Sequence, residues 1–179
     1  MNNLKELTVL PPEIQQLFMA QLNKATPTAA GVFRLVGIRT TEPGTYEEQR
    51  ITVLVLDENG FPIPGVKVAF SYSTAPQYVL SQDFQWTPPP PQKAFIVPTR
   101  GSGEIDQIQG SSVKDGQPGG VTVYCLESEH SSDYVSGCGM LVDHTGLHLT
   151  FQLQRAGVLP LAERLAAVEA RLAALEATS

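Results

Sequence analysis

The segment 147–154, LHLTFQLQ, strictly alternates apolar with polar residues, and no other pattern in the chain restricts its fold as strongly. Its apolar positions are Leu147, Leu149, Phe151 and Leu153, and its polar positions are His148, Thr150, Gln152 and Gln154. A period of two is that of a β-strand with one face in a core and the other turned outward. The segment therefore predicts a half-buried strand.

Further segments have the composition of strands, being rich in β-branched and apolar residues: 32–38, 51–56, 66–72 and 121–126. In 66–72 we expect Val66, Val68 and Phe70 on one face, against Lys67, Ala69 and Ser71 on the other. Short strands joined by turns such as DENG at 57–60, with no βαβ rhythm, predict a mainly β fold, a β-sandwich or small barrel.

The strand signal weakens between Ser73 and Gly120. The run TPPPP at 87–91 cannot donate ladder hydrogen bonds, and 101–120 is polar and rich in glycine. We expect long surface loops here, where binding surfaces and contacts between subunits are often built.

The N-terminal region predicts a short amphipathic helix over 11–24, which begins with two prolines. One face carries apolar residues suited to docking: Ile14, Leu17, Phe18 and Leu22. The small, proline-interrupted stretch 25–31 is typical of a linker. The helix is predicted to dock on another protein or a neighbouring subunit, and the alternative that it caps its own domain stays open.

The C-terminal residues carry the seam of a coiled coil. The apolar positions, spaced four and three apart, are Leu161, Leu165, Val168, Leu172 and Leu175. Arg164 and Arg171 fall at g positions, and Glu169 and Glu176 at the following e positions, so both g-to-e′ pairs join opposite charges in a parallel assembly. Leu at a with Val at one d position favours more than two strands, and we predict a homotrimer. An amphipathic helix folded on its own domain is the alternative.

Composition places these segments in one domain with appendages. The chain has 179 residues, of which 42% are hydrophobic and 17% charged. We expect an N-terminal arm over 1–30, a β-sandwich over 31–157 and a coiled-coil helix over 158–179. A net charge of −6, concentrated in the middle of the chain, disfavours nucleic acid as a partner. We expect no membrane insertion, and synthesis in the cytoplasm without a signal peptide.

The reactive side chains predict no enzyme, no metal and no cofactor. His144 and His148 stand four apart, but Gly146 and the strand pattern argue against a ligand pair, and we expect His148 to face outward. His130 has Ser and Asp neighbours without the geometry of a catalytic triad. Carboxylates in turns, interpreted as solvated, are Asp57, Glu58, Asp106, Asp115 and Asp133.

Two cysteines, Cys125 and Cys138, match no zinc signature. A disulfide requires that they face each other across neighbouring strands. Without an export signal we expect a reduced, half-buried pair.

An aromatic run from Tyr78 to Trp86 offers a second kind of site. Tyr78, Phe84 and Trp86 fall on alternate positions of an extended chain, where exposed rings would stack on sugars. The competing interpretation places these rings in the core.

Several segments together resemble a known accessory module. They are GVFRLVGIR at 31–39, ITVLVLDENGFPIPGVKVAFSY at 51–72, SSDYVSG at 131–137 and HTGLHLTFQLQR at 144–155. The chain is similar there to immunoglobulin-like or transthyretin-like sandwich modules of bacterial cell-wall-active, carbohydrate-active and phage proteins, especially from thermophiles. The resemblance carries no catalytic residue across.

The resemblance and the oligomerisation signal together imply a non-enzymatic structural protein. We expect a decoration, fibre or appendage subunit of a phage particle or surface filament, located on a virion or an extracellular particle. Its expected partners are further copies of itself and a larger assembly such as a capsid or filament. The alternative is a glycan-binding module for a cell-surface glycan, made multivalent by oligomerisation.

Overall fold

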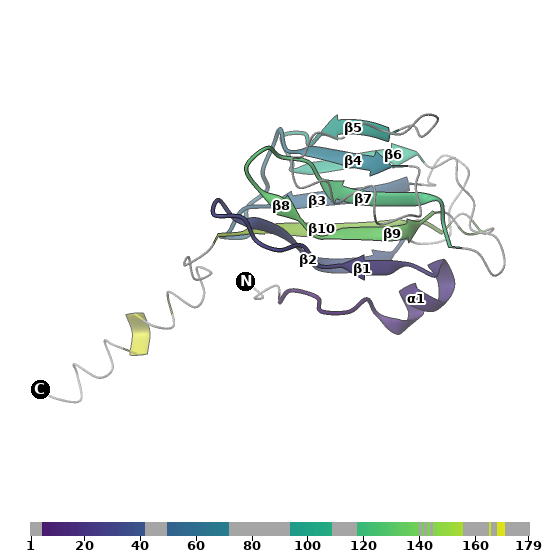
Figure 1. Ribbon diagram of the computed structural model, residues 1–179, viewed down its shortest axis with the longest axis horizontal. Coiled ribbons are helices and arrows are strands. Elements are labelled where there is room, and N and C mark those ends of the chain that lie inside the picture. The colour runs from purple at the N-terminus through teal and green to yellow at the C-terminus, as the bar shows by residue number, and fades with distance from the viewer. Residues whose placement is uncertain are drawn as a thin grey trace, which may run out of the picture.

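The protein is a mainly β structure of two packed sheets in the computed structural model (Figure 1). The structure describes residues 5–41, 50–71, 94–108, 118–139, 141, 143, 145–155, 165 and 168–170. Sheet A has the strand order β1-β9-β7-β4-β5, and sheet B has the order β6-β3-β10-β2-β8. The predicted β-sandwich class is therefore confirmed at the level of two stacked β layers.

Sheet A is antiparallel throughout. Its strands are β1 (Gln21–Asn23), β4 (Lys67–Ser71), β5 (Ala94–Pro98), β7 (Val121–Cys125) and β9 (Tyr134–Cys138). In Figure 1 they descend from β5 to β1, and helix α1 (Pro12–Phe18) lies beneath β1. The N-terminal segment therefore sits at the β1 edge of this sheet.

Sheet B is built around the strand with the alternating sequence. Its strands are β2 (Val32–Thr40), β3 (Arg50–Leu56), β6 (Glu104–Ile108), β8 (Ser131–Ser132) and β10 (Leu147–Gln154). β10 is central, antiparallel to β2 and parallel to β3. Its buried and half-buried residues alternate without error, as predicted.

The main core lies between the sheets and is filled from both. Sheet B contributes Phe33, Leu35, Ile51, Val53, Val55, Leu147, Leu149, Phe151 and Leu153, and sheet A contributes Val68, Phe70, Val121, Val123, Cys125, Val135 and Cys138. The N-terminal segment adds Leu10, Ile14, Phe18 and Ala20 to the same cluster. The described part of the expected arm, residues 5–30, is thus part of the sandwich.

Two strands lie where long loops were expected. β5 and β6 fall inside 73–120, and a turn at residues 99–103 connects the edge of sheet A with the edge of sheet B. The Thr99 hydroxyl donates to the Ile63 carbonyl (2.7 Å) and accepts from the Val66 amide (3.1 Å), which anchors that turn. The loop prediction was wrong for these residues because each strand is only five residues long and next to glycine-rich sequence.

The predicted helix over 11–24 is shorter than expected. It ends at Phe18, because Met19 adopts the left-handed conformation (φ 51°) and turns the chain back toward the sheet. Gln21–Asn23 then pairs with β9. Gly137 of β9, at φ +80°, lets this strand approach, since a β-carbon there would lie 2.8 Å from Ala20 Cα.

Candidate functional site

A groove lies on the β1 side of the molecule, between the segment before α1, the helix itself and β1. It has a volume of about 300 Å³ and is lined by Thr8, Val9, Leu10, Gln15, Ala20, Gln21, Leu22 and Asn23. The volume is at the lower end of the range for ligand pockets, roughly 300–1,000 Å³. The lining combines aliphatic side chains with three amides, which suits a short segment of chain better than a charged metabolite.

β1 is an outermost strand of sheet A, so the groove runs beside a sheet edge. Extended peptides bind to such edges by adding a strand. β1 has only three residues, and the lysine that follows it, Lys24, is the type of residue that limits unwanted edge pairing. The edge can therefore support only a short contact.

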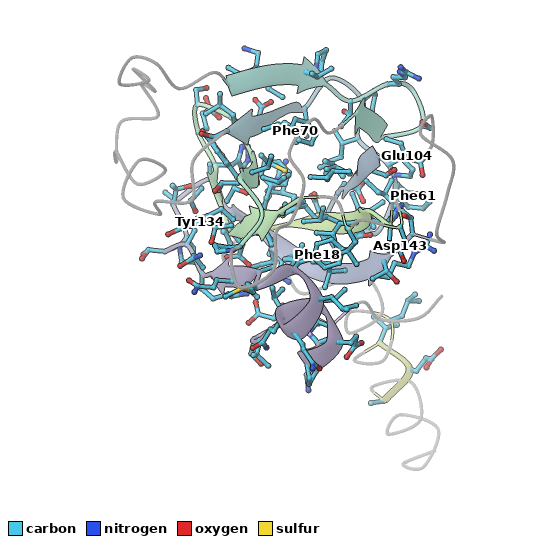
Figure 2. All side chains as sticks on the ribbon, turned by 90° about the vertical axis from the view of Figure 1, so that its right-hand side faces the viewer. Phe18, Phe61, Phe70, Glu104, Tyr134 and Asp143 are labelled. Carbon is cyan, nitrogen blue, oxygen red and sulfur yellow. The ribbon has the colours of Figure 1, made fainter. Side chains whose placement is uncertain are left out.

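The structure separates the four residues predicted to dock. Ile14 and Phe18 are buried in the main core, with 1% and 0% of their surface exposed, and Figure 2 shows Phe18 between α1 and the strands. The docking prediction was wrong for these two residues, because the helix uses its apolar face to close its own sandwich. Leu17 is 46% exposed, and Leu22 is half-buried and lines the groove. Val9 and Met19 are exposed apolar residues nearby in the chain.

A charged cluster joins the N-terminal segment to both sheets. At its centre Asp133 is fully buried and accepts four hydrogen bonds. Its Oδ1 accepts from Arg34 Nη1 (2.8 Å) and the Ala25 amide (3.0 Å), and its Oδ2 accepts from Lys24 Nζ (2.8 Å) and the Leu35 amide (3.1 Å). A buried carboxylate needs this many donors because burial removes its hydration.

Glu6 completes the cluster from the outer side. Its Oε2 lies 3.7 Å from Lys24 Nζ and 3.4 Å from Arg34 Nε, and that buried Nε makes no aligned hydrogen bond. The expectation that Asp133 is a solvated turn carboxylate was wrong. Both cations already have partners, so the cluster holds residues 6, 24 and 25 on the sandwich and does not present a free charge to a ligand.

The stretch 25–31, predicted to be a linker, is also fixed at several points. The Ala25 carbonyl accepts from Arg34 Nη1 at 2.8 Å. The Thr28 hydroxyl lies 2.8 Å from the Gly31 carbonyl and 2.7 Å from the Glu129 carbonyl. A connection held in this way does not let the helix reach a distant body.

The two cysteines are buried thiols at opposite ends of the β7–β9 pair. Cys138 is the last residue of β9 and pairs in register with Val121, the first residue of β7. Cys125 is the last residue of β7 and therefore lies at the other end of the strand pair. Four residues along a strand span about 13 Å, beyond the roughly 7 Å that a disulfide allows between Cα atoms. Burial raises the pKa of both thiols, so neither is an activated nucleophile.

The remaining candidate side chains have structural surroundings. His130 packs against the Phe33 ring with centroids 5.5 Å apart, and His148 lies half-buried on the outer side of β10. Asp57 Oδ1 accepts from the Asn59 and Phe61 amides, both at 2.8 Å, and so stabilises the predicted turn. Within the described residues no cluster of His, Cys, Asp or Glu has a composition that would hold a metal, and no helix there is suited to crossing a membrane.

The structure describes only some of the residues that were predicted to form a coiled coil. Leu165 and residues 168–170 are helical, and Leu165 and Val168 are 52% and 54% exposed. Glu169 is exposed as well. The other predicted oligomerisation residues lie outside the described residues: Leu161, Arg164, Arg171, Leu172, Leu175 and Glu176.

The predicted sugar-binding residues Tyr78, Phe84 and Trp86 also lie outside the described residues, as does His144. Comparison of the chain with protein-family models, with curated proteins and with solved structures found no match.

Proposed function

We propose that this protein is a non-enzymatic structural subunit that assembles as a homotrimer through its C-terminal helix. The exposed seam carries the proposal, because Leu165 and Val168 are helical and more than half of each side chain is in contact with solvent. Large aliphatic side chains repeated at heptad spacing stabilise a helix only when a partner helix covers them. The opposite-charge g-to-e′ pairs favour a parallel arrangement of identical chains.

Two heptads are too short to be stable alone, since isolated helices below about 15 residues are marginal in water. The sandwich therefore has to contribute to the assembly or hold the chains close together. A folded domain that precedes an oligomerisation helix is an arrangement suited to a decoration, fibre or appendage subunit.

The family assignment is part of the same proposal. An antiparallel sheet and a mixed sheet around one core, with a tight turn at 57–60 after β3, support an immunoglobulin-like or transthyretin-like module of a phage or surface particle. Attachment to a capsid or filament is proposed for the exposed residues of the N-terminal segment, Leu17 with Val9 and Met19. Multivalent glycan binding is the alternative, and it rests on the aromatic sequence at 78–86 and on the resemblance to modules of carbohydrate-active proteins.

The test is the mass of the full chain by size-exclusion chromatography with light scattering at micromolar concentration. We expect a trimer that Leu165→Asp dissociates, because the substitution places a charge in the apolar seam. Ala170→Asp is the matched control, since it adds the same charge at an f position outside the seam. A monomeric wild-type chain, or equal dissociation by both variants, would contradict the proposal.

A further inference from the structure

The outer edge of β1 carries a backbone donor and a backbone acceptor that point away from sheet A. Residues of an antiparallel strand alternate between facing their partner strand and facing away from it. The Ala25 amide donates to the carboxylate of Asp133, the residue just before β9, and therefore points toward β9. Asn23 and Gln21, which precede Ala25 at alternate positions, face β9 as well. The N–H and the C=O of Leu22 consequently point outward, beside the sheet.

The groove lies beside this edge, and Leu22 is one of its lining residues. On the other wall, the segment before α1 directs its hydrogen bonds elsewhere. The Leu7 amide donates to the Leu35 carbonyl (2.9 Å), and the Leu10 carbonyl accepts from Gln15 Nε2 (2.6 Å). Across the described part of the chain, no backbone hydrogen bond joins that segment to β1. The outward groups of Leu22 are therefore open to a further strand.

The groove has no charge of its own. Its lining residues are all uncharged. Glu6 and Lys24, which flank the lining segments in the chain, are ion-paired within the Asp133 cluster. Val9, which lines the groove, is 63% exposed. A charged occupant would lose hydration here without meeting an opposite charge, whereas an uncharged segment with an aliphatic side chain matches the lining.

The other sheet edges are less suited to the addition of a strand. β8 has only two residues, and β6 carries the acidic residues Glu104 and Asp106, which discourage edge pairing. Just after β5, the Thr99 amide donates to the Val66 carbonyl of the β4 side. Pro98 therefore lies at an outward-facing position, where it has no N–H to donate. β1 combines an outward donor and acceptor with a groove for a side chain.

We propose that the groove binds a short, extended and uncharged segment of the partner to which this protein attaches, and that the segment adds to sheet A as a strand beside β1. The segment donates to the Leu22 carbonyl and accepts from the Leu22 amide, and one aliphatic side chain enters the groove next to Val9. This inference rests on the proposed attachment through the N-terminal segment and specifies the chemistry of the partner's contact. A contact this short is weak in one copy and is strengthened by the several copies of the proposed trimer.

Fluorescence anisotropy of labelled peptides tests the proposal with the full chain. The probes are end-blocked pentapeptides that alternate threonine with valine, isoleucine or leucine, and a matched peptide in which lysine and glutamate replace the aliphatic residues. We expect the uncharged peptides to bind and the charged peptide not to bind. We also expect the uncharged peptides to slow hydrogen exchange of the Leu22 amide, measured by NMR on the chain made with isotope-labelled leucine.

Two variants locate the binding site. Leu22→Pro removes the outward N–H and leaves the pairing of Gln21 and Asn23 with β9 in place, an arrangement in which edge strands tolerate proline. It should raise the dissociation constant of the peptide about tenfold, because one hydrogen-bond acceptor of the peptide loses its donor. Thr8→Trp should weaken binding by filling the groove from an exposed wall. Glu13→Trp, at an exposed position of α1 outside the lining, is the matched control and should bind like the wild type.

Failure of every uncharged peptide to bind would overturn the inference, and so would unchanged binding in both Leu22→Pro and Thr8→Trp. A Leu22 amide already protected in the free chain would also overturn it, because a segment of this chain or of a second copy would then occupy the edge. A trimer that binds none of the peptides would leave the proposed assembly standing. A monomer that binds them would overturn the assembly and retain the groove as a binding site.

Discussion

Asp133 shows how one residue holds distant parts of this chain together. Its carboxylate is fully buried and accepts from Lys24, Ala25, Arg34 and Leu35. These partners precede it by 98 to 109 positions in the sequence. No local pattern around Asp133 reveals them, which is why the sequence suggested a solvated carboxylate.

Replacement of Asp133 by Asn should destabilise the fold on the order of 3 kcal/mol. The substitution removes the negative charge between two cations and turns an amide N–H toward a backbone N–H donor. Glu6→Gln is the matched control, because Glu6 is 38% exposed and its ion pairs are worth at most about 1 kcal/mol. Urea unfolding of both variants measures the difference, and equal losses would show that Asp133 is not the centre of the cluster.

At the scale of elements, β1 is the strand whose position depends most on its neighbour. Its three residues pair with β9 only because Gly137 has no side chain at the point of approach. A β-carbon at position 137 would lie 2.8 Å from Ala20 Cα and 2.9 Å from the Met19 carbonyl oxygen. These are backbone atoms that cannot move aside independently.

Gly137→Ala should therefore destabilise the protein by about 3 kcal/mol, through a left-handed backbone that disfavours alanine and through the clash with β1. Gly60→Ala separates the two causes. Gly60 has a similar φ of +86°, and a β-carbon there would meet no heavy atom within 4 Å, so about 1 kcal/mol is expected. Chemical denaturation of both variants checks the contrast, and a Gly137→Ala loss no larger than that of Gly60→Ala would remove the argument for steric approach.

At the scale of the whole molecule, both faces of sheet A are buried at β7, and this should limit stability in alkali. Burial raises the pKa of Tyr124 from 10.0 to about 12, and it also raises the pKa of Tyr134, Cys125 and Cys138. In the unfolded chain these groups lose their protons at lower pH than in the folded protein. The unfolded state then binds fewer protons, so the free energy of unfolding falls as the pH rises.

The contribution of Tyr124 is fully present below pH 10 and is lost between pH 10 and about 12. Tyr124→Phe should make the decline in that window shallower by at most about 1.4 kcal/mol per pH unit. Urea unfolding at stepped pH values measures both slopes. Identical slopes for the variant and the wild type would show that Tyr124 ionises equally easily in both states.

Elements whose pattern is local could be located from the amino-acid sequence. β10 was predicted with its bounds and its buried face, because one face meets the core and the other stays half-buried, which produces strict alternation. β2, β3, β4 and β7 were also located, each to within a few residues. The heptad seam is local in the same way, and its assembly stays a prediction.

Strands that are buried on both faces, and elements whose partners are far away in the sequence, could be identified only in the tertiary structure. All five residues of β9 are buried, so no alternation marks that strand in the sequence. Gln21–Asn23 continues a helical pattern in sequence and becomes a strand because β9 offers an edge beside Gly137. Ile14 and Phe18 formed a plausible docking face until the sandwich supplied the surface that buries them. An apolar helix face in the sequence predicts that its residues will be buried. Which surface buries them is determined only by the tertiary structure.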